Sequence, residues 1–142
     1  GYTGNPPLFP LFDKALPDDI VVININPLHR DKIPVTPPEI QNRINEISFN
    51  AWLLRELRAI TFVQRLIDEG HVAKGAMKYP RVHMIADDAL MNALSVATKT
   101  VPVPSVLAQL KEAGRRAAGH FLRDHKGALG KTQTANLREM FG

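Results

Sequence analysis

The residues that could do chemistry in this chain are few, and their spacing assembles no complete active site. Acyl transfer by a serine in an α/β protein needs an exposed strand-to-helix turn with the pattern Gly-x-Ser-x-Gly. None of the three serines, Ser48, Ser95 and Ser105, has glycines at those positions. The sequence also holds no Gly-x-Gly-x-x-Gly or Walker-type phosphate loop. These residues alone therefore predict no serine nucleophile and no nucleotide site.

The histidines and acidic residues do not form a metal-binding pattern either. No two histidines stand four residues apart, the spacing that places two ligands on one helical face. We interpret His83, in the apolar run 81–85, as a core histidine satisfied by hydrogen bonds instead of a catalytic base. The pair Asp87 and Asp88 is better explained as a helix cap than as a metal site. With no cysteine, thiolate chemistry and Cys-based zinc sites are excluded, so we expect no metal and no cofactor.

The composition is that of an ordinary globular domain with a mild positive charge. The 142 residues are 44% hydrophobic and make one domain at most, and no apolar run approaches the ~20 residues of a membrane span. No signal peptide is visible, and the absence of cysteine is compatible with the cytoplasm without fixing the location. Solvated helix faces explain the net charge of +4 most simply, and an anionic membrane surface is the alternative. We see no RNA-recognition pattern and no aromatic–basic interleaving, so nucleic acid is not an expected partner. The basic residues are spread along the chain, at Arg55, Arg58, Arg65, Arg115, Arg116 and other positions.

One long helix, from Thr36 to Gly70, organises the predicted structure. Thr36 and Glu39 have the spacing of a capping box, and Pro37 falls at the first helical position. Gly70 suits the left-handed position just past the last turn. At 1.5 Å per residue the helix would be roughly 50 Å long. We therefore expect a kink near residues 48–50, or packing on more protein than this chain contains.

Apolar residues recur along this helix in two stripes, which predicts burial over much of its girth. We interpret Phe49 and Trp52 as core residues, with a lipid-facing role as the alternative. So much apolar surface predicts that the chain alone exposes a hydrophobic patch. One stripe holds Ile40, Ile44, Ile47, Ala51 and Leu54, and the other holds Leu53, Leu57, Ile60, Phe62, Val63, Leu66 and Ile67.

The remaining pattern alternates strands with helices and indicates the α/β class. The β-branched run Ile20 to Ile25 predicts a strand buried on both faces, as in a parallel sheet covered by helices. Two strands are too few for the core of such a sheet, so we expect part of a larger α/β domain. We also expect one or two helical turns after Pro6, a strand over 81–85 and a short helix from Asp87 or Asp88 to about Leu94. A longer helix is expected from about Ser105 to His125, with close packing at Gly114 and Gly119 and a buried stripe of Leu107, Leu110, Ala113, Ala117 and Phe121. A last helix is expected with its cap at Thr132 or Thr134.

Several stretches resemble the C-terminal half of bacterial patatin-like phospholipases, in the same order and over nearly the whole chain. The most specific are the opening GYTGNPPLFPLF and the helix EIQNRINEISFNAWLLRELRAITFVQRLIDEG. The strand and turn DIVVININP, then RVHMI, LKEAGRRAAGHFL and the final REMF, also fit. The resemblance implies that residues 1–142 are the C-terminal part of a single patatin-like domain, a three-layer α/β/α fold with a mostly parallel sheet.

The same resemblance implies a lipid acyl hydrolase with a Ser–Asp dyad. In the family the serine sits in a Gly-x-Ser-x-Gly elbow, a Gly-rich loop forms the oxyanion hole, and the aspartate belongs to an Asp-Gly-Gly or Asp-Gly-Ala motif. Gly1 matches the last glycine of that motif, so both catalytic residues are expected upstream of this chain. The match places Gly1, Tyr2, Gly4 and Asn5 along the active site. The implied partners are the N-terminal part of the same domain and a lipid or acyl-ester substrate.

A second interpretation belongs to a different class of protein. The chain would be a stand-alone helical interaction module that binds an acidic partner or a membrane surface through its basic residues. The residues encoded upstream of Gly1 distinguish the two interpretations.

Overall fold

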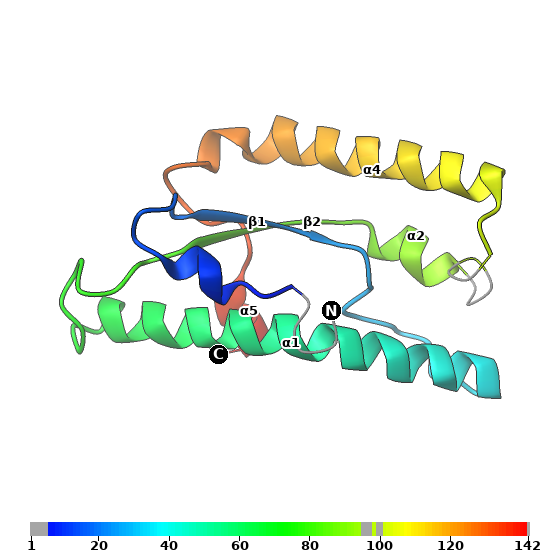
Figure 1. The fold of residues 1–142 in the computed structure, drawn as a ribbon, viewed down its shortest axis with the longest axis horizontal. Coiled ribbons are helices and arrows are strands. Elements are labelled where there is room, and N and C mark those ends of the chain that lie inside the picture. The colour runs from blue at the N-terminus through cyan, green and yellow to red at the C-terminus, as the bar shows by residue number, and fades with distance from the viewer. Residues whose placement is uncertain (1–5, 95–97, 99–100, 142) are drawn as a thin grey trace. The chain divides into compact units, whose positions relative to one another are not determined.

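A computed structural model describes residues 6–94, 98 and 101–141 of the chain (Figure 1). After a short 3-10 helix, the described elements follow a strand–helix–strand order and continue with helices. They are η1 (Phe9–Phe12), β1 (Asp19–Asn24), α1 (Pro37–Asp68), β2 (Arg81–Ala86), α2 (Asp88–Ala93), α4 (Pro104–His125), η2 (Lys126–Ala128) and α5 (Leu137–Phe141).

The chain divides into two compact units whose boundaries fall inside α1 and inside the strands. The first unit comprises Gly1–Val22, Ala51–Met84 and Gly127–Gly142. The second comprises Ile23–Asn50 and Ile85–Lys126. The core and the candidate sites below are therefore described within one unit at a time.

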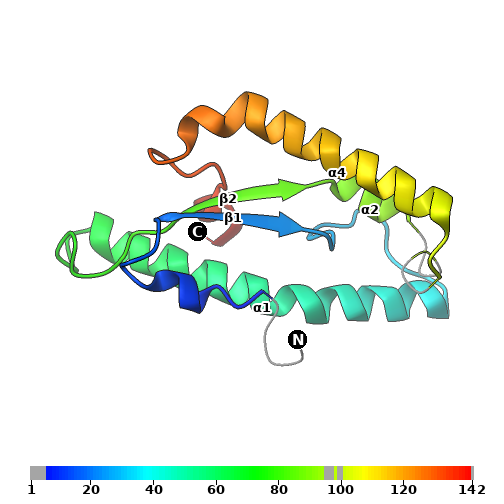
Figure 2. The same cartoon turned by 45° about the horizontal axis from the view of Figure 1, so that its top comes forward.

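β1 and β2 form a two-stranded parallel sheet, and α1 lies in the connection between them. Figure 2 shows the strands side by side and pointing the same way. A parallel pair requires such a crossover because the chain must return to the end of the sheet at which the first strand begins. The backbone N–H of Arg81 donates to the carbonyl of Asp18, 2.8 Å away, at the start of the pair. The predicted α/β class is confirmed at this level.

The core of the first unit forms where α1 meets one face of the strands. Leu53, Leu57 and Ile60 from α1 are buried with Ile20 and Val82 from the strands. Burial of each such side chain stabilises the fold by roughly 1.5–3 kcal/mol relative to exposure. The cluster is completed by Leu8, Val22 and Leu137, with Phe12, Met84, Ala135 and Phe141 packed against it.

The prediction that β1 has two covered faces is wrong for this chain. Ile20 and Val22 are buried, whereas Val21 is 46% exposed and Ile23 is 72% exposed. The strand therefore has an alternating burial pattern although its four central residues, 20–23, are all apolar. The described core covers only one of its faces.

Helix α1 runs without a break from Pro37 to Asp68, and the kink expected near residues 48–50 stays a prediction. At its start the carboxylate of Glu39 accepts the backbone N–H groups of Thr36 and Val35, each at 3.1 Å. These bonds, and a further one from the Thr36 hydroxyl, lower the pKa of Glu39 to about 2. At the other end Gly70 has φ +79°, the left-handed conformation that glycine adopts without strain. Both predicted ends are confirmed.

The buried face of α1 differs from the one that the apolar spacing predicts. Leu53, Leu57 and Ile60 of the second stripe are buried, but Ile44 and Ile47 of the first stripe are exposed. The interpretation of Phe49 and Trp52 as core residues is also wrong, because both are exposed. The side chains buried in the N-terminal half of the helix are polar: Asn42, Glu46 and Asn50.

Hydrogen bonds inside the second unit explain this polar burial. Arg30 donates from Nη2 and Nε to the two carboxylate oxygens of Glu46, at 2.6 and 2.7 Å. Asn42 donates to the same carboxylate at 2.9 Å, and Asn50 donates to the carbonyl of Pro27 at 3.0 Å. A buried carboxylate is stable only with such partners. They hold this face of α1 inward and leave its isoleucines in solvent.

The shorter helices confirm the expected elements but correct some details. Asp87 caps α2, because its carboxylate accepts the N–H of Leu90 at 3.0 Å. Asn136 caps α5 by accepting the N–H of Glu139 at 3.3 Å, so the predicted cap at Thr132 or Thr134 is wrong.

In α4, Ala113 and Phe121 are buried as expected but Leu107 is exposed. An added Cβ at Gly114 or Gly119 would meet no neighbour among the described residues, so the predicted close packing there is also wrong. Within the described residues, each helix is too short or too polar to cross a bilayer.

The cap of α1 gives the first testable prediction. Thr36→Ala should lower the free energy of unfolding by about 1 kcal/mol, because the Thr36 hydroxyl helps to hold the capping carboxylate of Glu39. The urea midpoint at neutral pH measures the loss. Gln41→Ala, at an exposed position one turn further on, is the matched control and should be near neutral. Equal midpoints for Thr36→Ala and the control would show that the cap contributes nothing.

Candidate functional site

The residues expected to line an active site lie outside the described part of the chain. Gly1, Tyr2, Gly4 and Asn5 were matched to the loop that follows a catalytic aspartate. Their placement at a site stays a prediction. The described residues offer two other clusters that could form a catalytic or binding site, both in the first unit.

The first grouping is a polar cluster between the two strands and the C-terminal segment. The carboxylate of Asp19 accepts Nε and Nη2 of Arg81, at 3.1 and 3.0 Å. Its Oδ1 also lies 3.0 Å from Nε2 of His83 and accepts the backbone N–H of Gly130 at 3.0 Å. On the other side of the imidazole, Nδ1 lies 3.0 Å from the hydroxyl of Thr134.

This hydroxyl–imidazole–carboxylate order is that of a nucleophilic triad. Two observations assign it a structural role instead. The side chain of His83 is 0% exposed, so no substrate can reach its ring. The carboxylate is saturated by Arg81 and by the N–H of Gly130. The cluster joins the C-terminal segment to both strands, and the prediction of a satisfied core histidine is confirmed.

The electrostatics of the cluster favour an ionised Asp19. The hydrogen bonds from Arg81 are the largest cause, and with those from His83 and Gly130 they hold the pKa of Asp19 well below its usual range, although burial opposes them. The pKa of Arg81 is raised by the same carboxylate. The pair therefore stays charged at neutral pH.

A buried lysine makes a second structural tie that the sequence analysis missed. Lys78 is buried, and its ammonium donates to the carbonyls of Leu11, Asp13 and Leu16, at 2.8, 2.7 and 2.9 Å. All three N–H donors of the ammonium are used. The lysine thereby fixes the loop between η1 and β1. No local signal in the sequence marks it, because its partners lie more than sixty residues away.

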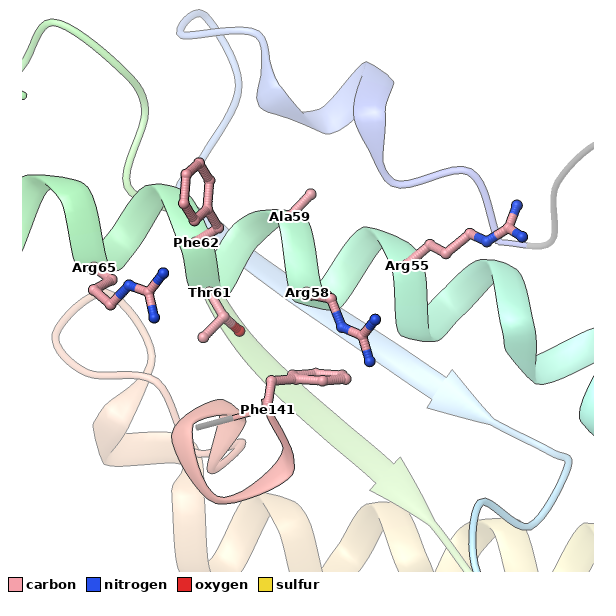
Figure 3. Close-up of a pocket in the computed structure, with 7 residues that line it drawn as sticks. All are labelled: Arg55, Arg58, Ala59, Thr61, Phe62, Arg65 and Phe141. Carbon is pink, nitrogen blue, oxygen red and sulfur yellow. The ribbon is translucent and has the colours of Figure 1, made fainter.

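The second grouping is a row of arginines and aromatic rings on the exposed side of α1 (Figure 3). Arg55 lies over Trp52 at 5.6 Å, and Arg65 lies over Phe62 at 5.6 Å, both within the helix. Arg58 lies 5.5 Å from the ring of Phe141 in α5. We call these six residues, Trp52, Arg55, Arg58, Phe62, Arg65 and Phe141, the α1 arginine face.

All residues of the arginine face except Trp52 line a hollow of about 490 Å³ on the surface of the first unit. The rings of the face are partly open to solvent: Trp52 is 38% exposed and Phe62 is 49% exposed. None of the three guanidinium groups forms an ion pair with a carboxylate among residues 6–94, 98 and 101–141. The hollow is lined by Arg55, Arg58, Ala59, Thr61, Phe62, Arg65 and Phe141.

A hollow of about 450 Å³ in the second unit provides a contrast. Each of its three cations has a carboxylate nearby: Arg30 and Arg43 share Glu46, and Lys32 lies 3.3 Å from Glu39. Charge is thus available for an external ligand at the arginine face and largely consumed at the second hollow. No three histidine, aspartate or glutamate side chains of the described chain come together as metal ligands.

The arginine face corrects the statement that aromatic and basic residues do not interleave. Trp52 and Arg55, and again Phe62 and Arg65, stand three residues apart, so each pair lies on one helical surface. This spacing is a local signal in the sequence, and the interpretation of both rings as core residues hides it.

A comparison with known proteins finds no matching family model, curated protein or solved structure. The function of the chain is therefore argued from its residues and from the resemblance described above.

The polar cluster predicts a specific loss of stability at neutral pH. Asp19→Asn should lower the free energy of unfolding by about 2 kcal/mol, because hydrogen bonds to charged groups contribute roughly 1.5–3 kcal/mol each and only some would be lost. Urea unfolding measures the change. Asp31→Asn, at an exposed aspartate, is the matched control and should be near neutral.

The same carboxylate predicts how stability depends on pH. The folded pKa of Asp19 lies below the unfolded value of about 3.9, so its contribution is complete above about pH 5 and is lost as the pH falls toward the folded pKa. The stability difference between the wild type and Asp19→Asn should therefore shrink between pH 5 and pH 3. Glu39 titrates in both proteins and cancels in the comparison. A difference that is constant over this range would contradict the ionic role of Asp19.

The loop tie predicts that Lys78→Met lowers the free energy of unfolding by about 2 kcal/mol, since three carbonyls lose their donor. Lys74→Met, at an exposed lysine nearby, removes the same charge without a comparable loss. Thermal unfolding of both variants distinguishes the two positions. If they melt at the same temperature, the three bonds of Lys78 do not stabilise the fold.

Proposed function

We propose that this chain is the C-terminal part of a patatin-like lipid acyl hydrolase, a serine esterase that cleaves acyl esters with a Ser–Asp dyad. In this proposal both members of the dyad lie upstream of Gly1. The carboxylate takes the proton of the serine hydroxyl as the oxygen attacks the ester carbonyl, and backbone N–H groups stabilise the oxyanion. The proposal rests on the resemblance of the opening, the first strand and the long helix.

One structural observation carries the proposal beyond the resemblance. The four central residues of β1, 20–23, are apolar, yet Val21 and Ile23 on one of its faces are exposed. Exposed β-branched residues in a parallel strand are expected where a further layer normally covers the sheet. A three-layer α/β/α domain supplies such a layer and more strands. The exposed isoleucines of α1, Ile44 and Ile47, point to missing contacts as well.

The described residues also supply no competing active site. The only hydroxyl–imidazole–carboxylate line among them, Thr134–His83–Asp19, is closed to substrate by the burial of His83. This agrees with a chain that supports catalytic machinery located elsewhere in a longer protein.

The alternative function, a stand-alone module that binds an acidic partner or a membrane surface, is favoured by a different observation. Among the described residues the three arginines of the α1 arginine face have no carboxylate partner, which supports a binding function that needs no upstream segment. The two functions make different demands on the gene. Only the hydrolase requires an Asp-Gly motif and a Gly-x-Ser-x-Gly elbow upstream of Gly1.

An esterase assay tests the proposed function. The 142-residue chain alone should not hydrolyse a p-nitrophenyl ester, whereas the protein expressed with its upstream residues should. Replacing the elbow serine by alanine should abolish turnover in the longer protein, because the nucleophile is lost.

Thr134→Val is the control, since it removes the hydroxyl that lies 3.0 Å from Nδ1 of the buried His83. It should leave the turnover of the longer protein unchanged. Turnover by the chain alone that disappears in Thr134→Val would move the active site to the polar cluster and refute the proposal.

A further inference from the structure

The α1 arginine face combines two chemistries that seldom occur together on a solvated helix. Three guanidinium groups carry full positive charge without a carboxylate partner in the described chain. Each of them also lies over an aromatic ring that is partly open to solvent. A ligand that binds both the guanidinium groups and the aromatic rings must present anions in one layer and apolar surface in the next.

Other exposed arginines of the chain lack this combination. In α4, Arg115 lies 3.0 Å from Glu112 and Arg123 lies 3.0 Å from Asp124. In the first unit, Arg138 lies 2.6 Å from Asp68. Their charges are partly compensated within the chain. Arg116 of α4 is also exposed, but no aromatic ring of the described chain lies beside it. Among the described residues, the combination of free arginines with aromatic rings is therefore specific to the arginine face.

We propose that the α1 arginine face docks on the surface of a bilayer that contains anionic phospholipids. Arg55, Arg58 and Arg65 bind lipid phosphates, while Trp52 and Phe62 enter the boundary between headgroups and acyl chains. Aromatic residues partition into this interface because one side of it is apolar and the other is wet. A guanidinium group binds phosphate through two parallel N–H donors.

A bilayer fits the face better than a nucleic acid does. Contacts to duplex DNA use polar side chains that reach base edges, and single-stranded nucleic acids bind through aromatic rings on which successive bases stack. Trp52 and Phe62 are ten residues apart, roughly 15 Å along the helix axis, which is too far for them to stack successive bases. The lining of the hollow contains only one uncharged polar residue, Thr61, and its remaining neutral members are Ala59, Phe62 and Phe141. Apolar side chains of this kind are solvated by the interfacial region of a membrane. The bilayer docking does not depend on the proposed hydrolysis, since binding requires no bond cleavage.

Vesicle co-sedimentation with the full chain tests the proposal. Vesicles are made of ether-linked phosphatidylcholine, with or without ether-linked phosphatidylglycerol, so no acyl ester is present and hydrolysis cannot affect the result. Each basic side chain near an anionic membrane contributes about 1 kcal/mol, or roughly fivefold in partitioning. Combined Arg55→Gln, Arg58→Gln and Arg65→Gln should therefore weaken binding to the anionic vesicles at least about tenfold.

The matched control changes the net charge by the same amount on α4. Combined Arg115→Gln, Arg116→Gln and Arg123→Gln should weaken binding less than about threefold. If the two triple variants lose vesicle binding equally, net charge alone explains the binding, and the assignment to α1 is overturned. Equal binding of the wild type to vesicles with and without phosphatidylglycerol would overturn it too. Circular dichroism verifies that both variants keep their helices.

Trp52 reports directly on the docking surface because it is the only tryptophan of the chain. Its emission should shift to the blue, and acrylamide should quench it less, when anionic vesicles are added. Inorganic phosphate alone should produce neither change. A blue shift with phosphate alone would indicate a small anion pocket, and tighter binding of a single-stranded oligonucleotide than of vesicles would indicate a nucleic-acid surface. Either result would overturn the bilayer proposal.

Discussion

The fold of the first unit depends on a single carboxylate, that of Asp19. It accepts hydrogen bonds from Arg81, which is 62 residues further along the chain, and from Gly130, which is 111 residues away. His83 completes the set from the neighbouring strand. A buried or half-buried carboxylate requires such partners because desolvation would otherwise outweigh its attractions. The start of β1, the strand β2 and the C-terminal segment are consequently held in one arrangement, and the apolar core forms beneath them.

Helix α1 performs two different tasks on one continuous backbone. In its C-terminal half, Leu53 and Leu57 face the core in the usual amphipathic manner. In its N-terminal half the buried face is polar, because Glu46 binds Arg30. An apolar residue such as Ile44 is left in solvent as a result. Hydrophobic periodicity alone cannot show this exchange, since both stripes of the helix are apolar and only non-local partners decide which one is buried.

The sequence predicted those features that depend on neighbouring residues. The cap at Glu39, the glycine end at Gly70 and the cap of α2 at Asp87 follow from backbone chemistry within a few positions, and all three are present. Burial and long-range ties could not be predicted in this way. The partners of Lys78 and the closure of the polar cluster exist only after the chain has folded. The spacing of the α1 arginine face was a local signal, and it was missed because its rings were assigned to the core.

The arginines of this chain show how the same residue type can serve structure or recognition. Arg30 is largely buried, and its charge is consumed by Glu46, so it holds the polar half of α1 and has little attraction left for an external anion. Arg55, Arg58 and Arg65 lie over aromatic rings, which favour a cation without neutralising it. A guanidinium group is weakly hydrated, so its transfer from water to a phosphate layer carries a small desolvation cost. For the proposed acyl hydrolase such a face has a direct consequence. With membrane lipids as the proposed substrates, docking through α1 would raise their local concentration before an ester enters the proposed catalytic site.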